Sequence, residues 1–133
     1  MSNGGIYIAS RVRHAEMWQR LRAAGAPITA TWIDEAGEGQ SESMSALWER
    51  ILLEVGRCDR LVFFAQPDDF PHKGALVEVG AALAMGKPVT VCLPGVDVEE
   101  RSGRPVGSWI SHPLVQREDS LDRAIVLSAK GGA

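Results

Sequence analysis

Short apolar runs alternate with longer amphipathic segments along most of the 133-residue chain. The short runs are rich in Ile, Val and Phe, which is typical of buried strands, and the longer segments repeat their apolar residues at helical spacing. Alternation of this kind predicts an α/β protein whose parallel sheet is covered by helices on both faces. Strands are expected within 5–10, 27–33, 60–65, 88–94 and, more briefly, 112–118, and helices within 13–25, 43–59, 73–87 and 119–130.

Length and composition narrow the class of protein. The length suits one compact domain spanning residues 1–133. A net charge of −3 and a pI of about 5.6 argue against a broad basic surface for nucleic acid. Cys58 and Cys92 each lie beside an apolar run, which favours reduced, buried thiols in a cytoplasmic protein, and no Cys/His cluster indicates a metal site. No signal-peptide pattern or membrane-length apolar run occurs, so no membrane partner is expected.

The expected sheet predicts where a ligand would bind. In open parallel sheets, ligands lie at the carboxyl ends of the strands, where the strand order reverses. The loops 10–14, 34–43 and 66–73 follow the first three expected strands and should therefore surround one cleft. Of these, 34–43 is polar and glycine-containing. The third expected helix begins at the third loop, so its first turns should face the same cleft.

That third helix carries one carboxylate, Glu78, among Ala, Leu, Val and Gly. An ionised carboxylate is expensive to bury without a partner, so the position suggests a nucleophile or a general acid/base. Burial would raise its pKa, whereas a helix N-terminus would lower it. The alternative interpretation is a local ion pair with Lys73 or Lys87.

The segment GALVEVGAALAMGKPV, residues 74–89, resembles the signature of the nucleoside 2-deoxyribosyltransferase superfamily, which includes nucleoside monophosphate N-glycosidases. In that family a glycine precedes the nucleophilic glutamate by a few residues. The glutamate begins a Glu-x-Gly-x-Ala run, and the segment ends in Gly-Lys-Pro. Other features of the chain are similar to the family as well. They are the strand IYIAS with Tyr7, the aspartate of CDRLVFF (Asp59), the loop QPDD, the total length and the order of the elements. The resemblance covers most of the chain, but only the segment around Glu78 is specific.

The resemblance implies a fold and a mechanism. The fold is a flavodoxin-like open parallel sheet of about five strands in the order 2-1-3-4-5. The family glutamate attacks the anomeric carbon of the sugar, and water or a second base resolves the covalent glycosyl-enzyme with overall retention. Glu78 would be the nucleophile, and Tyr7 would hold its rotamer by a hydrogen bond, unless Tyr7 is only a core residue of a central strand. No Gly-x-Gly-x-x-Gly or Walker lysine motif is present, so no cofactor is expected. The family commonly assembles as dimers or larger oligomers, so the resemblance implies a homo-oligomer.

The sequence departs from the family at two acidic positions. Six residues before the glutamate the transferases have an aspartate that binds and protonates the base, and here that residue is His72. His72 is a candidate acid, and Asp68 and Asp69 are candidate replacements for the missing carboxylate, although such residues are often solvated or form turns. A second family aspartate matches Ile51. Both differences bear on activity and substrate more than on fold.

Two further groups of residues are candidates for substrate binding. The hydrolase branch of the family holds a 5′-phosphate after the first strand and before the glutamate helix, where this chain has Ser10, Arg11, Arg13, Lys73 and Gly74. Trp32 ends the second expected strand at the cleft, where its ring would stack on a base or simply pack. Trp18 and Trp48 fall at helical core spacing and are expected to pack, and Trp109 is expected to cover the cleft or lie in a subunit interface.

The sequence therefore predicts retaining cleavage or transfer at the N-glycosidic bond of a nucleoside or nucleoside 5′-monophosphate, a small-molecule partner. Two alternatives stay open. One is a non-catalytic nucleotide-binding or sensing protein on the same fold, which the altered positions 51 and 72 favour. The other is an NAD glycohydrolase, because TIR-like domains place a catalytic glutamate on a similar sheet.

Overall fold

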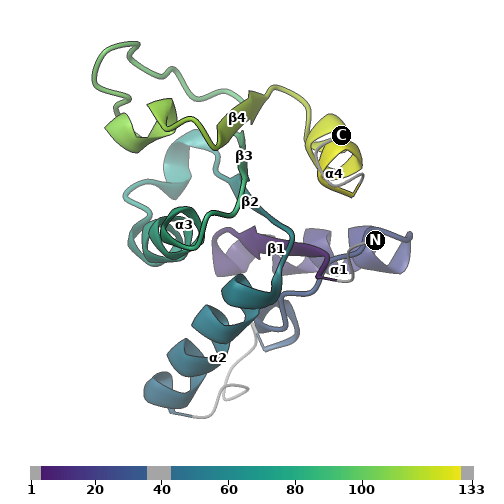
Figure 1. The fold of residues 1–133 in the computed structure, drawn as a ribbon. Helices are drawn as coiled ribbons and strands as arrows, with labels where there is room; N and C mark the ends of the chain where they lie inside the picture. The colour runs from purple at the N-terminus through teal and green to yellow at the C-terminus, as the bar shows by residue number, and fades with distance from the viewer. Residues whose placement is uncertain (1–3, 36–42, 130–133) are drawn as a thin grey trace.

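The computed structural model describes residues 4–35 and 43–129, and side chains up to residue 125. Four strands form one parallel sheet in the order β1-β2-β3-β4 (Figure 1). Tyr7 of β1 is in register with Leu61 of β2, and Leu61 with Val89 of β3. The strands are β1 (Ile6–Ala9), β2 (Arg60–Phe64), β3 (Val89–Cys92) and β4 (Val115–Glu118).

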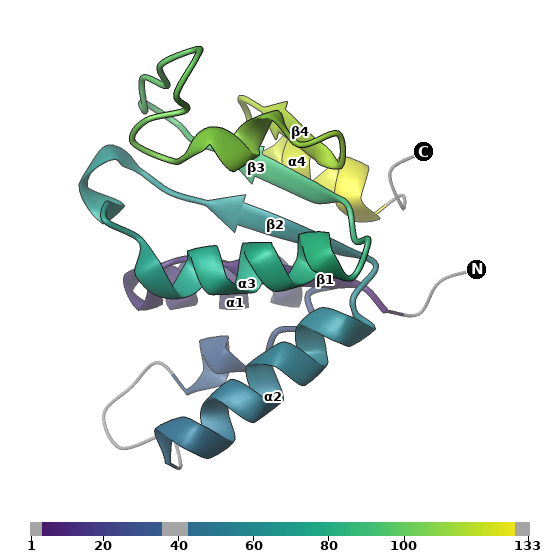
Figure 2. The ribbon, with the colours of Figure 1, turned by 60° about the vertical axis from the view of Figure 1, so that its left-hand side comes forward.

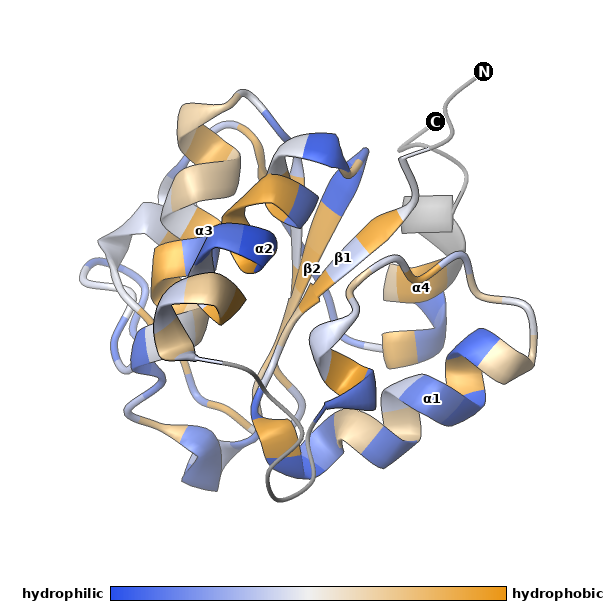
Figure 3. Cartoon of the chain, turned by 90° about the horizontal axis from the view of Figure 1, so that it is seen from below, coloured by the Kyte–Doolittle hydropathy of each residue, from blue (hydrophilic) through white to orange (hydrophobic). Residues whose placement is uncertain are grey.

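Four α-helices cover the two faces of the sheet. Helices α2 and α3 lie on one side of β1 and β2, and α1 and α4 lie on the other (Figure 3). The first three strands are buried at every position because helices cover both of their sides, and their sequences are accordingly almost wholly apolar. The helices are α1 (Ala15–Ala23), α2 (Met44–Arg57), α3 (Lys73–Ala84) and α4 (Leu121–Ala129).

The predicted second strand is largely absent. Of 27–33, only Ile28 pairs with β1, through an isolated parallel bridge to Ile6. Beyond it the chain turns into a 3-10 helix, η2 (Trp32–Asp34), because the Trp32 indole donates to the Ile8 carbonyl and Thr31 bonds to Glu54. Among the residues that the structure describes, the sheet therefore has four strands, where about five were expected. The bridge lies on the far side of β1 from β2, where the order 2-1-3-4-5 places the second strand.

Helix α3 packs directly against β1 and β2 (Figure 2). Its buried face consists mainly of small residues, which allow the helix to approach the sheet closely. The helix ends at Ala84, and the chain reverses through Gly86, whose φ of +75° favours glycine. This packing brings the first two turns of α3 to the carboxyl ends of β1 and β2.

Other expectations concern single residues and segments. Cys58 and Cys92 are buried free thiols, as predicted. Trp18 is fully buried in the core, also as predicted. Most of the polar loop 34–43 lies outside the described residues. Within the described part of the chain, no helix is both long and apolar enough to cross a membrane.

Candidate active site

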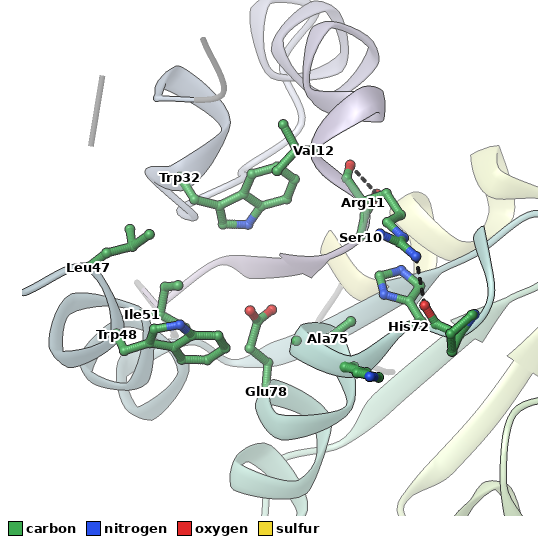
Figure 4. Close-up of a pocket in the computed structure, with 13 residues that line it drawn as sticks. Ser10, Arg11, Val12, Trp32, Leu47, Trp48, Ile51, His72, Ala75 and Glu78 are labelled. Carbon is green, nitrogen blue, oxygen red and sulfur yellow. Dashed lines mark hydrogen bonds between the residues drawn. The ribbon is translucent and has the colours of Figure 1, made fainter. Parts of the chain in front are cut away.

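A cavity of about 430 Å³ opens at the carboxyl end of β1, between α2, α3 and the loop that follows β1 (Figure 4). The loops after β1 and β2 both contribute to its wall, as expected for an open parallel sheet. Its lining has one end rich in aromatic and aliphatic side chains and another rich in polar ones. The lining residues are Ser10, Arg11, Val12, Trp32, Leu47, Trp48, Ile51, Pro71, His72, Lys73, Gly74, Ala75 and Glu78.

Glu78 lies in the second turn of α3 and directs its carboxyl group into this cavity (Figure 4). The residue is only 8% exposed. Burial raises the pKa of the carboxyl group to about 8, although the hydrogen bond with Tyr7 lowers it in part. Neither Lys73 nor Lys87 forms an ion pair with it within the described chain. The local ion pair considered from the sequence is therefore absent.

Tyr7 lies beneath the cavity on β1 and is fully buried. Burial, and next the charge of Glu78, raise the pKa of its hydroxyl group far above the usual value, so the phenol stays protonated. Within the described chain, the neighbour nearest to hydrogen bonding with its hydroxyl group is Glu78, and this contact falls outside ordinary hydrogen-bond geometry. We interpret the pair as close but imperfectly aligned, because the proximity affects the pKa of both groups. A small movement of either side chain would complete the bond.

Arg11 joins the loop after β1 to the loop after β2. Its guanidinium group donates from Nε to the Asp69 carbonyl at 2.9 Å and from Nη2 to the Pro71 carbonyl at 2.6 Å. Beside it, the Ser10 hydroxyl accepts a bond from the Trp18 indole at 3.0 Å. Ser10 and Arg11 both line the cavity, yet most of their hydrogen-bonding capacity already fixes the shape of its wall.

Arg13, Asp68 and Asp69, expected at the substrate site, lie outside the lining of this cavity. Asp69 has a fully buried carboxylate. It accepts hydrogen bonds from Arg13 at 2.7 Å, from His14 at 2.9 Å and from the backbone N–H of Gln66 at 2.7 Å. Asp68 is exposed and pairs with the same arginine at 3.0 Å.

The short 3-10 helix η3 (Pro67–Asp69) accounts for the position of Asp69. It aims the Asp69 side chain back at the start of α1 and away from Glu78. Burial raises the pKa of this carboxyl group, but the Gln66 amide, His14 and Arg13 together lower it further, so it stays ionised. The Asp69 carboxylate therefore has a structural role: it binds Arg13, His14 and the Gln66 backbone and does not face the cavity.

His72 reaches the cavity from the residue preceding α3 and is 4% exposed. Its ring packs on Phe63, with ring centroids 5.3 Å apart. Burial, and next the charge of Arg11, lower the pKa of the imidazole, so it is neutral near pH 7. One ring nitrogen bonds to the Phe64 backbone, and Nε2 has no partner among the described residues. The free nitrogen is therefore Nε2, an acceptor in the neutral tautomer.

An apolar wall of the cavity was not anticipated from the sequence. Trp48, predicted to pack in the core, is only half-buried and faces Trp32 from the opposite side of the cavity (Figure 4). Its ring lies over the first turn of α3, where a Cβ on Gly74 would be 3.7 Å from it. The same wall contains Val12, Leu47 and Ile51. The amphipathic pattern of α2 identified the apolar face of the helix. It did not indicate which residues of that face line a cavity and which pack in the core.

Three further residues that were expected to bind substrate are part of the cavity wall. Trp32 and Gly74 line the cavity together with Lys73, which is exposed at the first position of α3. Trp109, in contrast, is not part of the lining; it packs edge-on against Phe63 with ring centroids 5.7 Å apart. Ile51, where the family has an acidic residue, is buried in the wall, so the cavity lacks a carboxylate at that position.

Comparison with known proteins supports the fold. Neither the models of known protein families nor the curated proteins give a match to this sequence. Among solved structures, a 2-desoxiribosyltransferase from Leishmania mexicana is similar with a TM-score of 0.63 and 19% sequence identity. The match covers 94% of this chain and 96% of that one. The chain therefore has the α/β fold of that enzyme over nearly its whole length, and the likeness at this identity concerns the fold alone.

Proposed function

We propose that this protein cleaves or transfers the N-glycosidic bond of a nucleoside or nucleoside 5′-monophosphate, with retention of configuration, and that Glu78 is the nucleophile. The observation that carries the proposal is the Glu78 carboxyl group, buried yet directed into the cavity at the carboxyl end of β1. The fold of a 2-desoxiribosyltransferase and the signature around residues 74–89 support it. The assembly, dimer or larger, stays a prediction from the resemblance.

The chemistry requires an ionised carboxylate held against the anomeric carbon. The Glu78 oxygen attacks C1′ as the bond to the base breaks, and water or a second base then displaces the enzyme from the same face. Tyr7 stabilises the charged form by its hydroxyl group, which lowers the pKa of Glu78. Because burial opposes ionisation, the free protein holds Glu78 mainly protonated at neutral pH. Ligand binding must favour the ionised form.

The two ends of the cavity suggest how a nucleotide would lie. Trp32 and Trp48 offer aromatic faces for the base at one end. At the other end, Lys73 and the backbone amide of Gly74, at the start of α3, suit a phosphate group. Glu78 lies between these ends, where the sugar would be (Figure 4).

Release of free base from a panel of substrates tests the proposal. Purified protein is incubated with nucleosides, 2′-deoxynucleosides and their 5′-monophosphates, and free base is separated by chromatography. Glu78→Gln is the test variant, and Glu49→Gln, at an exposed glutamate of α2, is the matched control. Release from monophosphates alone indicates a hydrolase, and exchange with an added base indicates a transferase. Ligand binding without any cleavage would contradict the proposal and favour a nucleotide sensor.

A further inference from the structure

Within residues 4–35 and 43–125, no positively charged side chain lies close enough to the Glu78 carboxyl group to shift its pKa. Its pKa is shifted by burial and by Tyr7, and no cationic side chain contributes to that shift among the described residues. The titratable groups that share the cavity are Arg11, His72 and Lys73. Arg11 is bound to two backbone carbonyls, His72 is neutral, and Lys73 is exposed at the cavity rim. A buried carboxyl group in this setting becomes ionised most readily when a ligand brings a positive charge to it.

The walls on either side of this carboxyl group are also suited to a cation. Trp32 and Trp48 lie on opposite sides of the cavity, and the Glu78 carboxyl group opens into the cavity to one side of the two rings (Figure 4). The Trp32 ring is fixed because its Nε1 donates to the Ile8 carbonyl at 2.8 Å. The faces of indole rings attract cations, and the attraction is stronger when the site excludes water. Two indoles and one buried carboxyl group together form a site for a flat, positively charged ring.

Among the residues that the structure describes, the cavity wall offers no free acid to protonate a departing base. A neutral base leaves as an anion unless a general acid donates a proton to it. His72 is held neutral by burial, and the Asp69 carboxylate is committed to Arg13 and His14. Glu78 cannot donate a proton in the same step in which it acts as nucleophile. A base that already carries a positive charge needs no acid, because it departs as a neutral molecule.

We propose that the preferred substrates are N-glycosides of a positively charged base, such as a pyridinium or an N7-alkylated purinium ring, bound between Trp32 and Trp48 with the charge beside Glu78. The inference rests on the proposed function and narrows its substrate class.

The reaction balances without an acid or an oxidant. In the first step a Glu78 oxygen forms a bond to C1′, and the electron pair of the breaking C1′–N bond neutralises the ring nitrogen. In the second step water adds to C1′, the ester bond to Glu78 breaks, and one proton of the water is released to solvent. The sum is cationic glycoside plus water giving free sugar, neutral base and one proton.

Binding of a matched pair of bases tests the charge preference without any cleavage. The probes are the 1-methylnicotinamide cation and neutral nicotinamide, which differ by one methyl group and one charge and contain no glycosidic bond. Calorimetry at pH 7 in buffers of different ionisation enthalpy gives the affinity and the number of protons released. We expect the cation to bind at least about tenfold more tightly and to release close to one proton. Equal affinity, or a preference for nicotinamide, would overturn the inference.

Two variants identify the groups responsible. Glu78→Gln should remove the proton release and most of the charge preference, leaving the part due to the indole rings, while Glu49→Gln should keep both. Trp48→Leu should weaken binding of the cation about tenfold and leave the proton release of the remaining complex unchanged. A charge preference that is undiminished in Glu78→Gln would place the charge of the bound cation elsewhere and refute the assignment.

Cleavage assays separate failure of this inference from failure of the proposed function. Base release is measured from 7-methylguanosine and guanosine at pH 6, where the methylated base is cationic. Faster cleavage of 7-methylguanosine, dependent on Glu78, supports the inference. Glu78-dependent cleavage of guanosine at an equal or greater rate overturns the inference and leaves the proposed function intact. Glu78-dependent binding of the cation, with no glycoside of either kind cleaved, overturns both.

Discussion

The hydroxyl group of Tyr7, buried on β1, and the carboxyl group of Glu78, on α3, are coupled across the floor of the cavity. Glu78 contributes to the raised pKa of Tyr7, and Tyr7 in turn lowers the pKa of Glu78. The two residues are 71 positions apart in the sequence, and the packing of α3 against β1 brings them together. A hydrogen bond from the Tyr7 hydroxyl group would stabilise the ionised form of Glu78, which is the form that acts as the proposed nucleophile.

Replacing Tyr7 by Phe should slow the reaction and shift its dependence on pH. The hydroxyl group lowers the pKa of Glu78, so its loss raises that pKa above about 8 and leaves less ionised nucleophile at pH 7. We expect kcat/KM at pH 7 to fall about tenfold and the rising limb of its pH profile to move to higher pH. A tenfold loss without any displacement of the rising limb would show that Tyr7 acts through packing alone.

The stability of the protein should fall as pH rises toward 8 because of Glu78. Its pKa is about 8 in the folded protein and near 4.5 in a model peptide, so the folded state binds the proton more tightly. The stabilisation from this group is complete below pH 4.5 and is lost as pH rises through 8. Glu78→Gln should remove that loss.

Chemical denaturation of both proteins from pH 5 to pH 9 measures this effect. The free energy of unfolding of Glu78→Gln, relative to that of the unchanged protein, should increase by roughly 3–5 kcal/mol over the range. Taking the difference cancels other titrating groups, such as Asp69. A constant difference would mean that Glu78 titrates normally and is not held in an apolar environment.

Asp69 and Asp68 offer a matched comparison of a buried and an exposed ion pair with the same arginine. Asp69→Asn removes a buried charge that Arg13, His14 and the Gln66 amide all bind, so we expect a loss of about 3 kcal/mol in the free energy of unfolding. Asp68→Asn breaks an exposed, solvent-screened pair and should cost far less than Asp69→Asn. Equal losses would show that the buried network does not anchor the two loops.

Lys73 should distinguish nucleotides from nucleosides. If the start of α3 binds the 5′-phosphate, Lys73→Ala should raise the KM for a nucleoside 5′-monophosphate about tenfold and leave the KM for the matching nucleoside unchanged. Lys87→Ala, beyond the other end of the same helix, serves as the control. An equal rise for both substrates would place the phosphate elsewhere or leave it unbound.

Much of the fold could be predicted from the sequence because it depends on local patterns. The buried strands β1, β2 and β3 are almost entirely apolar. In α3 the apolar residues recur at helical spacing, and the Gly-Lys-Pro sequence that follows ends the helix. The segment 27–33 has the same β-prone composition, yet only Ile28 pairs with β1. The bond from the Trp32 indole to the Ile8 carbonyl that turns this segment away is a tertiary contact, and composition does not encode it.

The candidate site was only partly predictable for a related reason. Topology alone placed the start of α3 and the loop after β1 at one cleft, so Glu78, His72, Ser10 and Arg11 line a single cavity. Whether a loop carboxylate turns inward depends on its partners. His14, 55 positions away from Asp69, holds that carboxylate outside the cavity. Trp48 differs in the opposite direction: its helical spacing predicted burial in the core, but its side chain lines the cavity. No sequence pattern indicates where side chains leave a cavity open.

The central claim is that Glu78 forms a covalent bond to the sugar. A nucleoside 5′-monophosphate with fluorine at the 2′ position destabilises the oxocarbenium-like transition state and slows both steps, so a glycosyl-enzyme accumulates when water resolves it slowly. Mass spectrometry of the intact protein should then show the added mass of one sugar phosphate, and peptide mapping should place it on Glu78. Glu78→Gln should show no adduct and no base release. Base release by Glu78→Gln at the rate of the unchanged protein, or an adduct on another residue, would contradict the account.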